Sequence, residues 1–266
     1  MAKLVKEEFN SINEFLKTIN SRPNNSVMEG ENSSQSSDYD FTKTHSYAEA
    51  QELLESGYGE ILPKIKNEMK LKIKGTTSQR RIPYNDIVGY IPNVPNALLG
   101  VPQSMINKTT IKNKIRTVSI IYSPTGNWKI SADEFIKCGI VILNAINALE
   151  LNGIRVTLKV ACKCSEVKCQ QALCCVKVKD YRDHLDLKKL AFPIAHPSFF
   201  RRFGFKWMET NPSLTDSNWV YGYGHTIPIK KFTSYPAFVN DKLIDIRDVK
   251  EMGYDYKKVI ESFNLK

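Results

Sequence analysis

The chain has 266 residues, a formal net charge of +10 and a hydrophobic content of 42%. This size and composition suit one large domain with a buried core, or one domain with appendages. No apolar run is long enough to span a bilayer, and the charged first residues are unlike a signal peptide, so we expect a cytoplasmic protein.

The first 40 residues are expected to lie outside the main domain. Apolar residues recur at helical spacing in residues 1–21, which predicts an amphipathic N-terminal helix. Residues 22–40 are rich in Ser, Asn, Gly and acidic side chains, and this composition predicts a flexible linker. The main domain is then expected to extend over residues 41–225.

Two helices are expected at the start of the main domain. Ser46 and Glu49 have the spacing of a capping box, in which each side chain satisfies a free backbone N–H group. Gly57 is expected to end this helix, and a second helix is expected over about residues 60–72. Residues 75–107 contain four prolines, which favour a mostly fixed loop with short extended pieces, and the apolar side chains of this loop predict that it packs on the core.

The clearest pattern in the chain is a strand, a long helix and a second strand. Residues 116–122 form a β-branched apolar run, and residues 154–160 alternate between apolar and polar. Between them, Ser131 begins and Gly153 ends a helix that is apolar on nearly every side, which is typical of a buried helix. This order predicts an α/β fold, with a mostly parallel sheet and a buried crossover helix.

Residues 226–266 are expected to form a C-terminal extension. Residues 238–246 have the pattern of a β-hairpin that turns at Asn240–Asp241. Two short helices are expected to follow the hairpin, separated by Gly253.

A dense cysteine cluster marks a predicted hairpin at residues 160–177. Five of the six cysteines lie between Cys162 and Cys175. Thiols gathered at a hairpin tip can hold Zn²⁺ tetrahedrally, which predicts a structural zinc site. The C-x-C spacing is tighter than the usual C-x2-C, so a second interpretation stays open, in which reduced thiols pack as small hydrophobic groups. The candidate zinc ligands are Cys162, Cys164, Cys169 and Cys174.

Polar side chains follow the first strand of the predicted core. Ligands of open α/β sheets bind where such strands end. Ser123 and Thr125 offer hydroxyl groups there, and Asn127 offers an amide, so these three are the candidate ligand-binding residues. The alternative is an ordinary turn.

The positive charge of the chain permits binding to nucleic acid. The densest basic stretch precedes the first core strand, and two further arginines lie among phenylalanines, where they can grip a phosphate beside stacking rings. The alternatives are a solvated loop and a helix with solvated arginines. The candidate nucleic-acid-binding residues are Lys108, Lys112, Lys114, Arg116, Arg201 and Arg202.

No catalytic constellation stands out from the sequence. The four histidines form no metal-spaced pair, and the chain has no serine elbow, P-loop or dinucleotide fingerprint. Glu166-Val-Lys168 and Asp186-Leu-Lys188 match the acid-x-Lys pair of some metal nucleases, but such matches are common by chance. We expect a non-enzymatic binding or adaptor protein with a protein partner and no membrane partner. The alternatives are a nucleic-acid-binding protein and a metal-dependent nuclease or hydrolase.

Several phrases of the sequence are familiar as a set: residues 9–15, 41–50, 89–95, 100–105 and 192–198, the last followed by Arg201-Arg202. Together they resemble an uncharacterised family of proteins encoded by bacteriophages and prophages, over most of residues 9–225. The resemblance implies a viral protein in the host cytoplasm. It implies no known activity and no catalytic residues.

The strand–helix–strand core also resembles a von Willebrand A-type domain, which has a Rossmann-like fold. The metal site of that family uses a D-x-S-x-S motif after the first strand, where this chain has Tyr122-Ser-Pro-Thr-Gly126. Ser123 and Thr125 match the hydroxyl ligands of the motif. The aspartate that anchors Mg²⁺ is missing, so a working metal site is not expected.

Overall fold

The computed structural model describes residues 3–28, 32–65, 81–110, 116–126, 129–168, 170–215, 219 and 223–265. The chain divides into two compact units, one formed by Met1–Leu71 with Thr117–Leu265 and the other by Lys72–Arg116. In the part of the chain that is described, no helix has both the length and the apolar character needed to cross a membrane.

The first unit contains a sheet, several helices and short irregular turns. Its strands are β1 (Lys3–Phe9), β5 (Arg116–Ser123), β6 (Ile154–Val167), β7 (Gln170–Lys179), β8 (His225–Thr226) and β9 (Lys242–Asp245). Its α-helices are α1 (Ile12–Ser21), α2 (Tyr39–Thr42), α3 (Tyr47–Ser56), α5 (Ala132–Leu151), α6 (Leu187–Ala195), α7 (Phe205–Thr210), α8 (Ile246–Glu251) and α9 (Tyr256–Ser262). A π-helical turn, Phe199–Gly204, precedes α7, and 3-10 turns occur at Ser26–Met28, Ser33–Gln35, Leu62–Lys64, Ile229–Phe232 and Pro236–Phe238.

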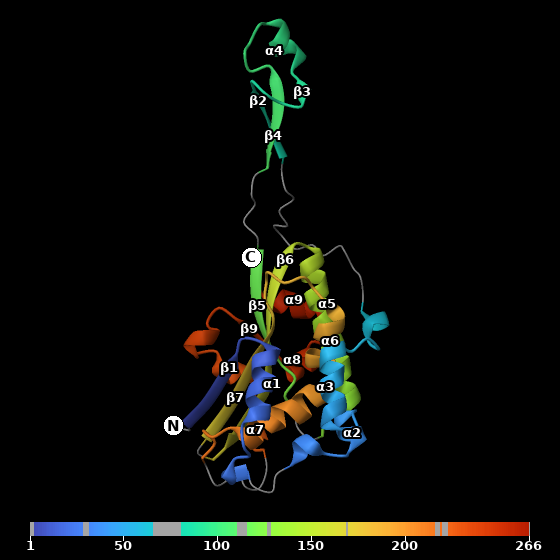
Figure 1. The fold of residues 1–266 in the computed structure, drawn as a ribbon, viewed down its shortest axis with the longest axis vertical. Helices are drawn as coiled ribbons and strands as arrows, with labels where there is room; N and C mark the ends of the chain where they lie inside the picture. The colour runs from blue at the N-terminus through green and yellow to red at the C-terminus, as the bar shows by residue number, and fades with distance from the viewer. Residues whose placement is uncertain are drawn as a thin grey trace. The chain divides into compact units, whose positions relative to one another are not determined.

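The central sheet has the strand order β1-β7-β6-β5-β9, and β8 pairs with β6 (Figure 1). The pairs β1–β7 and β5–β9 are parallel, whereas β6 and β7 are antiparallel. On the edge of β6 that faces away from β7, β8 pairs with Ser165 and Glu166, near the end of the strand. Strand β5 shares this edge and therefore lies along residues of β6 that come earlier in the chain. Thr125, just after β5, donates a hydrogen bond to the carbonyl of Ala161 (3.4 Å). The end of β5 therefore lies beside the middle of β6, and the two strands run in the same direction.

Helix α5 connects these two strands, as the sequence predicts. The Ser131 hydroxyl caps it by accepting a hydrogen bond from the backbone N–H of Glu134 (3.2 Å). The helix is followed by Gly153, whose φ of +77° lies in the left-handed region that favours glycine. It packs against β6, α6, α8 and α9 and is buried along most of its length. The mostly parallel α/β sheet with a buried crossover helix is thus confirmed.

A separate apolar cluster covers the other face of the sheet. Burial and the nearby Cys138 of α5 both raise the pKa of Tyr122, so Tyr122 faces α5. Strand alternation then turns Ile121 to the opposite face. There Ile121 packs with Leu173 of β7 and with side chains from residues 227–238. The sheet therefore lies between a helical layer and a layer of short turns.

The predicted N-terminal helix over residues 1–21 is wrong in its first half. Residues 3–9 form the edge strand β1, which pairs with β7 and buries Val5 and Phe9. The helix begins only after Ser11, whose hydroxyl accepts a hydrogen bond from the N–H of Glu14 (3.1 Å). The pairing with a strand more than 160 residues away decided the structure of this segment.

The predicted flexible linker at residues 22–40 is held to the first unit at particular residues, although most of its described residues are exposed. Ser34 is buried and donates from its backbone N–H to the carboxylate of Glu209 (3.0 Å). The Asn25 amide donates to the carbonyl of Leu214 (2.8 Å). Some of the Ser and Asn side chains that suggested solvation, such as those of Asn25 and Ser34, instead bond to other parts of the first unit.

The helix predicted from Ser46 is confirmed as α3. The Ser46 hydroxyl accepts from the N–H of Glu49 (3.1 Å), and the Glu49 carboxylate accepts from the N–H of His45 rather than of Ser46. Gly57 follows the helix with a φ of +83°. Of the second helix predicted over residues 60–72, Leu62–Lys64 forms a 3-10 turn, and residues 66–72 lie outside the described residues.

The predicted C-terminal hairpin over residues 238–246 is wrong. Strand β9 instead pairs in parallel with β5, from Ile120 opposite Lys242 to Ser123 opposite Asp245. The two short helices predicted after it are confirmed as α8 and α9, and Gly253 lies between them with a φ of +69°.

The second unit is a small antiparallel sheet with the order β2-β4-β3. It contains β2 (Arg81–Asp86), β3 (Ile91–Pro92), β4 (Met105–Thr110) and the short helix α4 (Val94–Leu98). Pro83 and Pro92 lie on its two edge strands, where a missing N–H is tolerated. Where the loop predicted over residues 75–107 is described, its expected short extended pieces are the three strands of this sheet, and α4 and turns connect them. Its apolar side chains are largely exposed, with Leu98 at 83% and Leu99 at 78%.

Candidate anion-binding cavity

A cavity of about 680 Å³ lies where β5 ends, beside the middle of β6. Parallel strands of open α/β sheets commonly place ligands at their carboxyl ends, so this is the expected position for a site. The side chains around it come from distant parts of the chain. It is lined by Phe41, Thr125, Gly126, Ile130, Lys163, Phe200, Arg201, Phe205, Tyr223, Gly224, His225, Thr226 and Arg247.

A β-bulge in β6 places Lys163 at this cavity. The register between β6 and β7 shifts between Ala161 and Lys163, so Cys162 is an extra residue in the strand. The Sγ atom of Cys162 lies 3.1 Å from the Sγ atom of Cys174. Lys163, the next residue, is only 2% exposed and lines the cavity.

Aromatic rings surround the Lys163 amine. Its Nζ atom lies 4.8 Å from the ring centre of Phe205, 5.2 Å from that of Phe200 and 5.8 Å from that of Tyr223. Among the described residues, no carboxylate forms an ion pair with it. Burial lowers the pKa of Lys163 to about 7, because the ammonium form loses its hydration. The ring faces act in the opposite direction, since they attract the ammonium form.

Arg247 supplies a second cation, with one nitrogen that is buried and unsatisfied. Within the described part of the chain, its Nη2 atom has no hydrogen-bond partner. Its Nε atom lies 3.9 Å from Asp245. The Asp245 carboxylate already accepts hydrogen bonds from the backbone N–H groups of Arg247 (2.9 Å) and Asp248 (3.1 Å). The Arg247 side chain is 43% exposed, so its guanidinium group is partly solvated and only Nη2 is left buried without a partner in the described part of the chain.

Arg201 supplies the third cation and is held more firmly. Its guanidinium carbon lies 4.1 Å from the ring centre of Phe41 and 4.5 Å from that of Phe135. Its terminal nitrogens donate to the carbonyls of Phe41 and Ile130. Burial lowers the pKa of Arg201 to about 10, which still leaves it charged near neutral pH.

The charges around this cavity have one sign. Lys163, Arg201 and Arg247 line it, and His225 lies exposed beside them, but its lining contains no Asp or Glu among the described residues. Lys163 and Arg201 are buried, whereas the Arg247 side chain is 43% exposed. A buried cation without a carboxylate partner is costly, and an anionic ligand can supply the missing charge. The arrangement is chemically suited to an anion with an apolar or aromatic body.

The structure brings one candidate ligand-binding residue to the cavity and places another behind it. Thr125 lines the cavity, and its hydroxyl lies 2.6 Å from the hydroxyl of Ser123. Ser123 is fully buried. Asn127 lies outside the described residues.

The candidate nucleic-acid-binding residues do not share one environment. Arg202 is fully buried and donates to the hydroxyls of Thr42 and Thr44, so it is not available to a phosphate. Arg201 is buried at the cavity, and Lys108 is exposed on β4 of the second unit. Arg116 begins β5, and Lys112 and Lys114 lie outside the described residues.

The candidate zinc ligands that are described do not converge. Cys162 contacts Cys174, whereas Cys164 packs with Leu173 and Cys175 on the other face, because the bulge reverses the alternation. No three His, Cys, Asp or Glu side chains of the described residues are placed to hold a metal. Burial raises the pKa of Cys164 to about 12, which favours the neutral thiol. Cys169 lies outside the described residues.

The two nuclease-like tripeptides have structural contacts. Glu166 pairs with Lys231 (3.3 Å) and accepts a hydrogen bond from Gln171 (3.3 Å). Asp186 caps α6 by accepting from the backbone N–H of Lys189 (3.1 Å).

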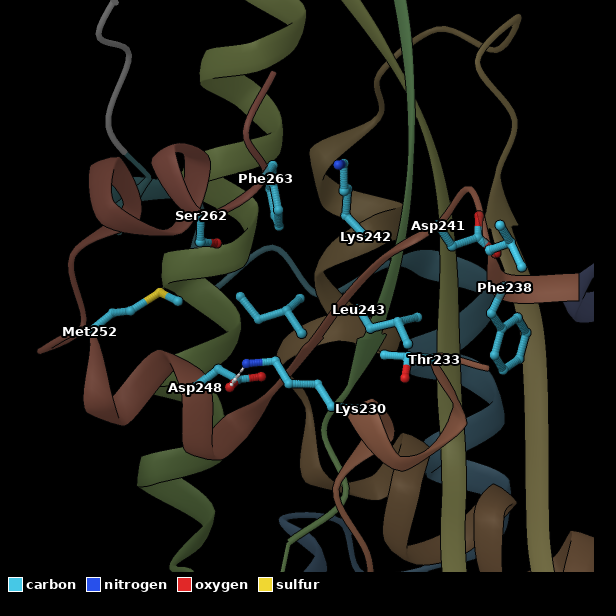
Figure 2. A pocket seen from close by; sticks show the side chains of 12 residues that line it. Lys230, Thr233, Phe238, Asp241, Lys242, Leu243, Asp248, Met252, Ser262 and Phe263 are labelled. Carbon is cyan, nitrogen blue, oxygen red and sulfur yellow. Dashed lines mark hydrogen bonds and ion pairs between the residues drawn. The ribbon is translucent and has the colours of Figure 1, made fainter. Parts of the chain in front are cut away.

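A smaller cavity of about 280 Å³ lies beside the edge strand β9 (Figure 2). Figure 2 shows the ion pair between Lys230 and Asp248 at this cavity. The other carboxylate in its lining, Asp241, is paired with Lys159 (3.0 Å). Because its carboxylates are already paired, we take the larger cavity as the candidate site.

Sequence reasoning missed Lys163, His225 and Arg247. If the strand alternated regularly after Val160, Lys163 would point to the face opposite Cys162. The bulge changes this alternation and brings the Lys163 side chain to the cavity. Arg247 is the second residue of α8, and the parallel pairing of β9 with β5, which the predicted hairpin did not include, brings it near the end of β5. A lysine between two cysteines in an apolar strand was the one local signal.

Comparison with curated proteins and with solved structures found no match. The resemblances to a bacteriophage-encoded family and to von Willebrand A-type domains therefore stay predictions. The model of one protein family, described as a domain of unknown function (DUF7192), matches residues 2–264, and the chain belongs to this family.

Proposed function

We propose that this protein is a binding protein that holds a small anionic ligand in the cavity beside β5 and β6. The observation that supports the proposal is the lining of that cavity, which includes Lys163, Arg201 and Arg247 and, among the described residues, no Asp or Glu. Isolated buried cations cost several kcal/mol, so an anion that enters this cavity replaces the stabilisation that water no longer provides.

The size and lining of the cavity narrow the class of ligand. Its volume of about 680 Å³ is typical of sites for small molecules rather than for single inorganic ions. The rings of Phe200, Phe205 and Tyr223 give it an apolar wall beside the cations. The proposed ligand is thus a phosphate or carboxylate compound with an aromatic or apolar body.

Calorimetric titration of the full chain with phenyl phosphate and with pyrophosphate tests this function. We expect saturable binding of phenyl phosphate, weaker binding of pyrophosphate, and a thermal stabilisation that rises with ligand concentration. Arg247→Met is expected to weaken binding at least tenfold, because it removes the cation whose buried Nη2 atom has no hydrogen-bond partner among the described residues.

Arg182→Met is the matched control, because the Arg182 side chain is 73% exposed and pairs only with its neighbour Asp180 among the described residues. It is expected to bind as the wild type does. If neither compound binds, or if both variants bind equally, the proposal is wrong.

A second candidate function rests on the second unit, where we propose that a protein partner docks. Asp86 is the only charged residue between Pro83 and Met105. The exposed apolar side chains of this unit include Ile87, Val88, Leu98 and Leu99. Surfaces that are apolar and poor in charge are typical of the centre of a protein interface.

A photo-crosslinking amino acid at Leu98 tests this second function in cells. We expect one protein adduct from Leu98 and none from the exposed control position Lys189. Nucleic-acid binding remains the alternative; it predicts affinity for random DNA or RNA that falls steeply with salt.

A further inference from the structure

We propose that Lys163 forms a reversible imine with an aldehyde group of the anionic ligand, so that the cavity holds its ligand covalently. This inference rests on the proposed function and names the ligand class more closely: an anion that carries an aldehyde. The amine nitrogen attacks the carbonyl carbon, and the resulting carbinolamine loses water to give the C=N bond. The oxygen leaves with two protons as water, so the step needs no oxidant or reductant, and hydrolysis reverses it.

The position of the Lys163 amine supports this chemistry. Its side chain lines the cavity but is almost fully buried, and the neighbours of Nζ are three aromatic rings. Among the described residues, no carboxylate fixes it as an ammonium ion. A desolvated lysine amine in an apolar pocket is the form in which lysine acts as a nucleophile toward carbonyl compounds.

The presence of two arginines gives Lys163 a role beyond charge. Arg201, which is buried, and Arg247, which is partly exposed, line the same cavity and both keep their charge, so they suffice to attract the anionic part of a ligand. A lysine adds what arginine cannot supply, which is a nitrogen that loses its proton and then reacts.

The acid–base equilibrium of Lys163 agrees with this role. Burial lowers the pKa of Lys163 to about 7, from an ordinary value of 10.5. Near neutral pH, a large part of Lys163 is therefore the free amine, whereas an exposed lysine is almost wholly protonated.

Borohydride trapping on the full chain tests the proposal. The probe is pyridoxal 5′-phosphate, because it combines an aldehyde, an aromatic ring and a phosphate. After reduction and peptide mapping, we expect the main adduct on Lys163, at least tenfold above any exposed lysine. Lys163→Arg is expected to lose this adduct, and the matched variant Lys189→Arg is expected to keep it.

Two further compounds separate this inference from the proposed function. Pyridoxal lacks the phosphate, and we expect it to label Lys163 at least tenfold less. Pyridoxine 5′-phosphate lacks the aldehyde, and we expect it to bind reversibly and to protect Lys163 from labelling.

The imine and the anion site can fail separately. Binding of pyridoxine 5′-phosphate without any adduct on Lys163 overturns the imine and leaves the anion site intact. Labelling scattered over exposed lysines, with no binding of pyridoxine 5′-phosphate, overturns both. Mapping of the wild-type chain decides the matter even if Lys163→Arg does not fold.

Discussion

At the scale of single residues, two buried cations are satisfied in different ways. Arg202 makes four hydrogen bonds, to the hydroxyls of Thr42 and Thr44 and to the carbonyls of Ser34 and Thr44. Lys163 has aromatic rings around it and a cavity beside it. Arg202 therefore holds the N-terminal segment to the π-helical turn, while Lys163 is left available to a ligand.

Replacement of Arg202 tests its structural role. Arg202→Met leaves two buried hydroxyls and two carbonyls without their donor, and we expect the free energy of unfolding to fall by about 3 kcal/mol. Urea denaturation measures this loss. The exposed control Arg182→Met is expected to change stability by about 0.5 kcal/mol or less. Equal effects of the two variants would contradict the assigned role.

The pKa of Lys163, lowered to about 7, predicts a pH-dependent stability. Between about pH 7 and pH 9, the unfolded chain holds a proton on Lys163 that the folded protein has largely released, so stability rises with pH. Lys163→Met lacks this contribution. We expect the stability difference between wild type and variant to shift by about 2 kcal/mol in favour of the wild type over these two pH units.

Denaturant unfolding of both proteins at pH 7 and pH 9 measures the shift, because other titrating groups cancel in the difference. A difference that stays constant with pH means that Lys163 remains protonated in the fold.

At the scale of elements, the approach of α5 to α6 depends on one glycine. A Cβ atom on Gly139 would lie 2.3 Å from the Cβ atom of Ala195 and 2.9 Å from the carbonyl oxygen of Ile194. No side chain at this position fits without moving a helix. The small residue here is a packing requirement, although glycine lowers the intrinsic helix propensity.

Gly139→Ala is therefore expected to destabilise the protein by about 1–3 kcal/mol, through overpacking, despite the better helix propensity of alanine. Thermal unfolding measures the effect. Leu151→Ala, at the half-exposed end of the same helix, is the control and is expected to cost about 1 kcal/mol or less. A stabilised Gly139→Ala variant would show that the two helices are further apart.

At the scale of the whole molecule, some large apolar side chains are buried in the core and others are exposed on the surface. Leu149 is fully buried in α5, whereas Leu98 in the second unit is 83% exposed. Burial decides the free-energy cost of removing a leucine side chain, so the two positions are a matched pair.

We expect Leu149→Ala to lower the free energy of unfolding by about 2–5 kcal/mol, and Leu98→Ala to change it by about 0.5 kcal/mol or less. Denaturant unfolding of both variants checks this. A large loss from Leu98→Ala would mean that this side chain is covered in the folded protein, and the docking proposal would then fail.

The amino-acid sequence by itself determined the local features of this protein. Helix α5 is predictable with its Ser131 cap and with Gly153 after it, because capping and periodicity depend on residues within one or two turns. The strands on either side of it, and the placement of Thr125 near a site, follow from the same local signals and from the general topology of α/β sheets.

Only the tertiary structure decided which distant segments meet. Residues 3–9 became a strand because β7 offered them an edge, and Lys163 reached the cavity because of a bulge opposite β7. Arg201 and Arg202 were buried because carbonyls and hydroxyls from residues 34–44 and 130 surround them. Such outcomes depend on pairings between residues far apart in the chain, and no local pattern contains the geometry of those pairings.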